Sequence, residues 1–189
     1  SMETMIAIKE MYVRGAPLIG VTAAFGFALA MREDPSDLGL EKAYDLLTSA
    51  RPTAVNLEWA SRLMINKLKS VDVGERVSKS MSMAVQIAND DIETNKRIGK
   101  YGAEVIRSIA VNKTDNSPVR ILTHCNAGWL ATVDRGTATA PMYEAAGQGI
   151  DISVWVDETR PRNQGAALTS WELHHNNIAS KLIVDNAGG

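Results

Sequence analysis

The hydrophobic pattern of this 189-residue chain changes at a polar segment, residues 112–117, which reads NKTDNS and is followed by Pro118. Before this segment, apolar residues recur with the 3.6-residue period of helices. After it, short β-prone runs alternate with helical patterns, as in strand–helix–strand units. The change predicts two domains, a helical domain over residues 1–111 and an α/β domain over residues 112–189.

The first domain is predicted to be entirely helical. After one or two helical turns within residues 1–11, we expect helices at residues 18–32, 40–49, 55–70 and 75–110. The helix at residues 18–32 is apolar around nearly its whole circumference, which predicts that it is largely buried. Gly99 and Gly102 interrupt the last pattern and are candidates for a break in that helix.

The second domain alternates strands and helices. Strands are predicted at residues 119–123, 150–156 and 181–184, with helical segments within residues 129–147 and at residues 164–174 between them. Short connections of this kind force right-handed crossovers and predict a doubly wound parallel sheet. Ligands of such sheets bind beyond the carboxyl ends of the strands. Cys125 and Asp157 both fall there, so we expect them to face one crevice.

Composition excludes several classes of function. The formal net charge of −2 gives no general attraction for nucleic acid or anionic membranes, so any anion-binding site must be local. A single cysteine excludes an intramolecular disulfide and a thiolate-rich zinc site, and it suits a reducing cytoplasm. The most apolar run, residues 18–31, is too short to span a bilayer, and no signal-peptide pattern precedes it. We therefore expect a soluble, cytoplasmic protein without nucleic-acid or membrane partners.

Two arginines lie in proline-containing turns that open predicted helices. Arg14 precedes Gly15 and Ala16 in the sequence VRGAP, and Arg51 opens the sequence RPTAVN. Helix N-termini present unpaired N–H groups and partial positive charge, and an adjacent arginine can add bidentate contacts to a phosphate. The alternative is that both arginines are solvated or structural residues of helix caps. The RGAP turn lacks the longer glycine-rich cradle of a P-loop, so both interpretations stay open.

Cys125 follows a predicted strand and precedes a turn into a helix, a place where a positive helix end favours a reactive thiolate. A lone cysteine is also common as a small buried hydrophobe. His124 precedes it directly, but neighbouring residues of an extended strand point to opposite faces, so we do not expect a Cys–His dyad. His174 and His175 lack partners at metal-ligand spacing. We therefore expect no metal site and a surface or helix-end role for both histidines.

Residues 157–165, DETRPRNQG, place two acids and two arginines between a strand and a helix. Salt bridges among these charges would make a rigid structural loop. Alternatively, the loop orients a polar ligand, and Gln164 together with the following helix N-terminus contributes hydrogen bonds. The residues alone leave both possibilities open.

Four stretches together resemble one known family. MYVRGAPLIG, RPTAVNLEWA, LTHCNAGWLATVDRGTA and DETRPRNQGAALTSWEL are similar, in order and spacing, to motifs of the 5-methylthioribose-1-phosphate isomerase family. This family belongs to a superfamily with the regulatory subunits of translation initiation factor 2B. The resemblance implies a helical N-terminal domain packed on a Rossmann-like domain, a homodimer, and no cofactor or metal.

The resemblance also implies an activity and a set of site residues. The reaction is the aldose-to-ketose conversion of methylthioribose 1-phosphate to methylthioribulose 1-phosphate in methionine salvage. Cys125 is then the catalytic cysteine. The resemblance implies that the phosphate is held by Arg14, Gly15 and Ala16 of the first turn together with Arg51 of the second turn. It implies that Gln164 also binds the substrate.

This chain departs from the family pattern in length and at three positions. Family members are longer at both ends, and their catalytic aspartate and an Asn-Lys pair lie after the last strand predicted here. We therefore expect a fragment with impaired turnover. Asp134 and Arg135 stand where the family usually has Gly-Tyr, and Asn163 stands where it usually has Leu.

Two alternative functions fit the same motifs. One is a non-catalytic interaction protein or sugar-phosphate-binding remnant, as the initiation-factor branch of the superfamily suggests. The other is a ribose-1,5-bisphosphate isomerase, which also uses an Arg-Pro-rich loop and a cysteine.

Overall fold

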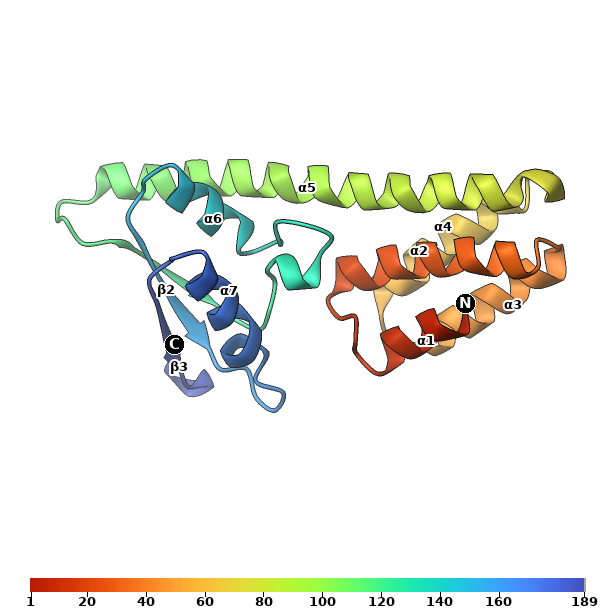
Figure 1. Ribbon diagram of the computed structural model, residues 1–189. Helices are drawn as coiled ribbons and strands as arrows, with labels where there is room; N and C mark the ends of the chain where they lie inside the picture. Colours follow the sequence, from red (N-terminus) through yellow and green to blue (C-terminus); the bar gives the residue numbers. More distant parts are fainter. Residues whose placement is uncertain (189) are drawn as a thin grey trace. The chain divides into compact units, whose positions relative to one another are not determined.

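The computed structural model describes residues 1–188 and shows an α/β protein of two compact units (Figure 1). The units are Ser1–Asp91 and Ile92–Gly189, called unit 1 and unit 2 below. Their boundary lies within the long helix α5, Arg76–Asn112, which ends where the polar segment begins. The predicted fold class is confirmed, because a helical region precedes a small parallel sheet.

Unit 1 is helical throughout, as predicted. Its elements are α1, Met2–Lys9; α2, Ala16–Glu33; α3, Asp37–Ser49; α4, Val55–Leu68; the short 3-10 helix η1, Val73–Glu75; and the first part of α5. Helix α2 is buried along most of its length, as its apolar circumference predicts. Phe27 and Met31 of this helix are completely buried in the core of the unit.

Helix α2 is the one helix within residues 1–188 that is long and apolar enough to cross a membrane by length and composition. It extends beyond the predicted apolar run on both sides and has 18 residues. Of this span, 56% is buried inside the protein. Core helices pass the same test of length and composition, and burial in unit 1 accounts for the apolar character of α2.

The starts of α2 and α4 lie at the same end of unit 1. Gly15 precedes α2 with φ 95°, a conformation that glycine adopts without strain, and Pro17 occupies the first turn. A Cβ placed on Gly20 would lie 3.0 Å from the carbonyl oxygen of Asn56, the second residue of α4. Because Gly20 is also near the beginning of α2, the two helix N-termini are neighbours.

A buried arginine joins the beginning of α5 to the helices before it. Arg76 is only 3% exposed, and its Nε donates to the carbonyl oxygens of Leu68 and Val71, both at 3.1 Å. The two remaining guanidinium nitrogens donate to the Pro35 carbonyl at 2.9 Å and to Asp37 Oδ1 at 2.6 Å. Arg76 therefore links three segments of unit 1 through one planar group.

Unit 2 contains a three-stranded parallel sheet in the order β1-β2-β3. The strands are β1, Val119–Thr123; β2, Ile152–Asp157; and β3, Ser180–Ile183, so the three predicted strands are confirmed. The connections contain the 3-10 helix η2, Trp129–Ala131; α6, Ala140–Gly147; the π-helix η3, Gly165–Thr169; and α7, Ser170–His175; the 3-10 helix η4, Asp185–Ala187, follows β3. The helix predicted at residues 164–174 is thus two consecutive elements.

The two faces of the sheet differ. One face forms the core of unit 2, where residues of β1 and β2 pack with residues of α5, α6 and α7; its fully buried members are Ala103, Ala145, Val154, Val156 and Leu173. On the other face, the paired residues Leu122 and Trp155 are 50% and 37% exposed. The Nζ of Lys181 lies 5.9 Å from the centre of the Trp155 ring.

Helix α5 continues through Gly99 and Gly102, so the predicted break is wrong. A Cβ on Gly102 would lie 2.3 Å from Cγ of Pro141, and one on Gly99 would lie 3.3 Å from the carbonyl oxygen of Ala140. Both glycines let α6 lie against α5, as Figure 1 shows. They provide space for a neighbouring helix, whereas the sequence pattern predicts a break in α5 at these positions.

Candidate functional site

Cys125 and Gln164, two of the predicted site residues, lie together at the carboxyl edge of the sheet in unit 2. Cys125 follows β1 in a left-handed backbone conformation, with φ 63°. Its Sγ lies 3.4 Å from Oε1 of Gln164, which directly precedes η3, and the thiol donates this hydrogen bond. The thiol is half-buried. The predicted reactive group and the predicted ligand-binding amide are therefore in direct contact.

The backbone of Cys125 is held by two threonine side chains. Its N–H donates to Oγ1 of Thr159 at 2.8 Å, and its carbonyl oxygen accepts from Oγ1 of Thr169 at 2.6 Å. Thr159 belongs to the loop after β2, and Thr169 is the last residue of η3. Neither threonine was predicted as a site residue. Their contacts show that the loop after β2 and the following helix together fix the position of the cysteine.

A buried carboxylate organises the turn that follows Cys125. Glu172 of α7 is completely buried, and its Oε2 accepts from the Trp129 N–H at 2.9 Å and from Tyr143 Oη at 2.8 Å. Its Oε1 accepts from Asn126 Nδ2 at 2.8 Å and from the Leu130 N–H at 3.2 Å. Burial raises the pKa of the Tyr143 phenol, so it remains a donor. The sequence pattern does not indicate this role for Glu172.

Asp157 ends β2, and its side chain contacts His124, the residue before Cys125. Its Oδ2 lies 3.1 Å from Nδ1 of His124. The ligand atoms of His124, Asp157 and Asp185 lie within 4.8 Å of one another, and one imidazole with two carboxylates is a donor set that divalent cations use. Backbone contacts of Asp185 explain its position without a cation.

The carboxylate of Asp185 braces the loop after β2. Its Oδ1 accepts from the Thr159 N–H at 2.7 Å, and its Oδ2 accepts from the Arg160 N–H at 2.8 Å. These hydrogen bonds, the one from Arg160 first, lower the pKa of Asp185 below its ordinary value. The acid that orders the loop therefore comes from beyond β3, whereas the structural alternative expected salt bridges among the loop's own charges.

The predicted phosphate-binding residues form one end of unit 1. Gly15 and Ala16 open α2, and Arg14 directly precedes them. Arg51 lies in the turn before α4, where its carbonyl oxygen accepts from the Ala54 N–H at 3.0 Å. Neither helix start has a side-chain cap, so N–H groups of two adjacent N-termini are available for an anion. The structure thus brings the two predicted turns together within unit 1.

The two histidines of α7 occupy the end of that helix. His174 and His175 lie in its last turn and are exposed. Nδ1 of His175 lies 2.8 Å from the Trp171 carbonyl oxygen, and the centres of the His175 and Trp171 rings are 3.9 Å apart. These contacts agree with the predicted helix-end role.

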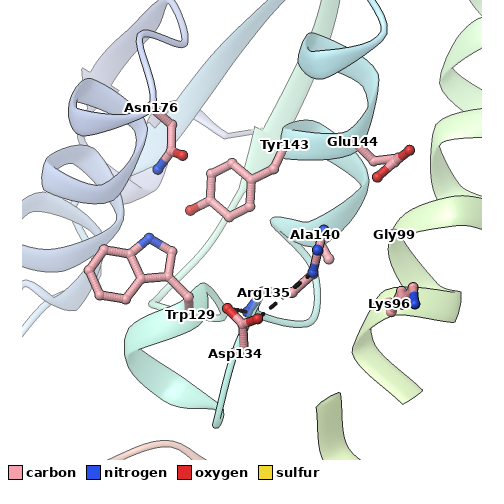
Figure 2. A pocket seen from close by; sticks show the side chains of 9 residues that line it. All are labelled: Lys96, Gly99, Trp129, Asp134, Arg135, Ala140, Tyr143, Glu144 and Asn176. Carbon is pink, nitrogen blue, oxygen red and sulfur yellow. Dashed lines mark hydrogen bonds and ion pairs between the residues drawn. The ribbon is translucent and has the colours of Figure 1, made fainter. Parts of the chain in front are cut away.

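A polar pocket of about 240 Å³ lies elsewhere in unit 2 (Figure 2). Figure 2 shows Trp129, Tyr143 and Asn176 on one side and Lys96 of α5 on the other. Asp134 and Arg135 also line it and form an ion pair at 3.9 Å. Its lining includes none of the predicted site residues.

These features define the class of protein. A helical unit with two paired helix starts and a parallel-sheet unit with a cysteine at its carboxyl edge are joined in one chain, as the sequence motifs imply. The chain matches the Initiation factor 2 subunit family over residues 12–189 and belongs to that family.

Within that family, the chain is similar to named isomerases. It is 56% identical to the methylthioribose-1-phosphate isomerase of Sinorhizobium medicae, over 97% of this chain and 50% of that protein. It is 57% identical to the one of Escherichia coli O45:K1, over 97% of this chain and 49% of that protein. The chain therefore spans about half the length of the curated relatives it matches.

Solved structures agree with both branches of the predicted resemblance. The 5-methylthioribose 1-phosphate isomerase of Pyrococcus horikoshii matches with a TM-score of 0.83 and 40% identity, over 98% of this chain and 52% of that one. The translation initiation factor eIF-2B subunit delta of A. fulgidus matches with a TM-score of 0.80 and 42% identity, over 97% of this chain and 54% of that one. The resemblance is confirmed.

Proposed function

We propose that this chain belongs to a methylthioribose-1-phosphate isomerase and carries its phosphate-binding turns and its reactive thiol. The proposed reaction converts methylthioribose 1-phosphate to methylthioribulose 1-phosphate in methionine salvage. The observation that carries the proposal is the 3.4 Å contact between Cys125 Sγ and Gln164 Oε1, in a chain 56% identical to a named isomerase. A thiol facing an amide beyond a parallel sheet suits a polar sugar substrate.

The proposed phosphate ligands are the residues at the paired helix starts of unit 1. Backbone N–H groups beginning at Gly15 and Ala16 supply donors and partial positive charge. Arg14 and Arg51 add permanent charge and fork-shaped donors that match phosphate oxygens. A local site of this kind accounts for anion binding by a chain whose formal net charge is −2.

Gln164 and Cys125 are the residues proposed to act on the sugar. The phosphate on C1 locks the sugar as a ring, so an acid must open the ring before hydrogen moves between C2 and C1. Gln164 orients the sugar by hydrogen bonding, and Cys125 acts at the reacting carbons. We propose no cofactor or metal, a small-molecule sugar phosphate as partner without nucleic acid or membrane, a homodimer, and a cytoplasmic location.

The phosphate site is tested by titrating the 189-residue chain with methylthioribose 1-phosphate in a calorimeter. Arg51→Ala should weaken binding about tenfold or more, because it removes a charge-assisted contact. Arg62→Ala is the matched control, since Arg62 is an exposed arginine of the adjacent helix α4 that pairs with Glu58. Equal affinity of the Arg51 and Arg62 variants would contradict the assignment.

The sugar site is tested through the single thiol of the chain. Bound methylthioribose 1-phosphate should slow alkylation of Cys125 by iodoacetamide, because the substrate covers the sulfur. Inorganic phosphate at the same occupancy should protect less, since it fills only the phosphate site. Full reactivity of Cys125 in the presence of saturating substrate would contradict its proposed role.

A non-catalytic role is the second candidate function. It is favoured by the 42% identity to the eIF-2B subunit delta of A. fulgidus. Thermal unfolding in the presence of methylthioribose 1-phosphate and of ribose 1,5-bisphosphate separates the candidates, since a ligand of the folded state raises stability. Stabilisation by the first sugar alone supports the proposed isomerase, and stabilisation by neither supports an interaction protein.

A further inference from the structure

Cys125 adopts a backbone conformation that an L-residue with a Cβ rarely adopts. Its φ of 63° lies in the left-handed region, and Thr159, which faces it, has φ 65°. Such conformations cost free energy and persist only where surrounding contacts hold them. For Thr159 the cost is greater, because its side chain is β-branched. Contacts strong enough to hold both residues must therefore be present.

The contacts that hold Cys125 come from two threonine hydroxyl groups. Thr159 Oγ1 accepts the Cys125 N–H at 2.8 Å, and Thr169 Oγ1 donates to the Cys125 carbonyl at 2.6 Å. Both polar groups of the cysteine backbone thus have side-chain partners, although the residue lies outside the regular ladder of β1. The two hydroxyl groups approach Cys125 from different segments and restrict both of its peptide planes.

Each hydroxyl group is itself oriented. The Thr159 hydroxyl donates to the Asp157 carbonyl at 3.0 Å, which leaves a lone pair for the Cys125 N–H. The Thr159 backbone N–H donates to Asp185 Oδ1 at 2.7 Å. Thr169 is completely buried, and its Oγ1 also accepts from Asn126 Nδ2 at 3.3 Å. Neither hydroxyl can rotate away from Cys125 without breaking another hydrogen bond.

We infer that Thr159 and Thr169 are positioning residues that hold the thiol of Cys125 against Gln164. This inference rests on the proposed function, in which Cys125 and Gln164 act on the same substrate. Without either hydroxyl, the Cys125 backbone relaxes from the left-handed region toward extended geometry. The Sγ then leaves Oε1 of Gln164 and becomes more accessible to solvent.

The test is the alkylation rate of Cys125 by iodoacetamide in the 189-residue chain, followed by mass spectrometry. Thr159→Val and Thr169→Val keep the size and β-branch of threonine and remove only the hydroxyl. We expect each to raise the alkylation rate about fivefold, the factor that corresponds to one hydrogen bond of about 1 kcal/mol. Thr159→Ser and Thr169→Ser keep the hydroxyl and should restore the slow rate.

Thr137→Val is the matched control for general loosening of the fold. Thr137 Oγ1 also donates to a backbone carbonyl of the same segment, that of Ala127 at 3.2 Å, but it does not contact Cys125. This variant should alkylate at the rate of the unchanged chain. Equal acceleration by Thr137→Val, no acceleration by Thr159→Val and Thr169→Val, or no rescue by serine would each overturn the inference.

The alkylation test is independent of the proposed reaction. If Cys125 is alkylated as expected but methylthioribose 1-phosphate does not protect it, the positioning role stands and the proposed substrate is wrong. If the substrate protects Cys125 but the valine variants leave the alkylation rate unchanged, the substrate assignment stands and the positioning role is wrong.

Discussion

Replacing Glu172 with glutamine should destabilise unit 2 strongly, although the two side chains have almost the same shape. The carboxylate of Glu172 accepts four hydrogen bonds inside the protein, two at each oxygen. An amide provides one oxygen and replaces the other with an NH₂ group, which is a donor. Whichever way the amide is turned, its NH₂ group faces a backbone N–H, that of Trp129 or that of Leu130.

The magnitude follows from these contacts. The buried backbone donor left without an acceptor costs about 1–3 kcal/mol. The hydrogen bonds that remain change from charge-assisted to neutral and are about half as strong. Reduced desolvation of the neutral side chain offsets part of this loss. We therefore expect Glu172→Gln to lower the free energy of unfolding by about 2–4 kcal/mol, a large share of the roughly 5–15 kcal/mol typical of a folded protein.

Urea denaturation followed by tryptophan fluorescence measures this change, because Trp129 and Trp171 both lie close to Glu172 in unit 2. Glu144→Gln is the control, since Glu144 of α6 accepts a hydrogen bond from Gln148 at the surface. This control should change stability by less than about 0.5 kcal/mol. A change of equally small size for Glu172→Gln would refute the view that the buried carboxylate organises the turn after Cys125.

Three further predictions concern other contacts. Arg76→Lys should lower the free energy of unfolding of unit 1 by about 1–3 kcal/mol, because an ammonium cannot reach all the acceptors that the buried guanidinium contacts. Urea denaturation measures this change. Arg97→Lys, at the surface, is the control and should leave the stability unchanged. Gly102→Ala should lower the free energy of unfolding by about 2 kcal/mol although alanine has the higher helix propensity, because the alanine Cβ would overlap Pro141. An unchanged midpoint of thermal unfolding would contradict this prediction. Because folding lowers the pKa of Asp185 below its ordinary value of 3.8, the ionised side chain stabilises unit 2 at pH values above 3.8. This contribution is lost as the pH falls below 3.8. Asp185→Asn should therefore lose less stability than the unchanged chain between about pH 5 and pH 3, and an equal loss would contradict the brace.

The elements that could be predicted from sequence are those whose apolar residues repeat at one period. Helix α4 and strand β2 have such repeats and lie where the pattern places them, and α2, which is apolar on all sides, is also found at its predicted place. The apolar repeat predicts that α3 starts at Leu40, but the helix begins at Asp37 because Ser36 caps it by accepting the Gly39 N–H at 3.1 Å. The polar cap lies outside the apolar repeat, so periodicity alone did not detect it.

Site residues that belong to a family motif could be predicted from the sequence. Residues whose role depends on a contact in the folded protein could not. The family motifs identify Cys125 and Gln164, and the structure brings both side chains into contact. The roles of Thr159, Thr169 and Glu172 come from contacts with segments far away in the chain. In addition, a polar residue within a helical pattern is normally interpreted as solvent-exposed. One signal was available for Glu172, which lies on the same helical face as Thr169, a buried small residue.

The threonine contacts also determine when the thiol becomes protected during synthesis. The partners of the Cys125 N–H and carbonyl lie 34 and 44 residues later in the chain. As the polypeptide leaves the ribosome, Cys125 emerges before the segments that will fix it, and closing such long loops is slow relative to local helix formation. The single cysteine of the chain is therefore open to oxidants and electrophiles until residues 159–169 have been translated and folded.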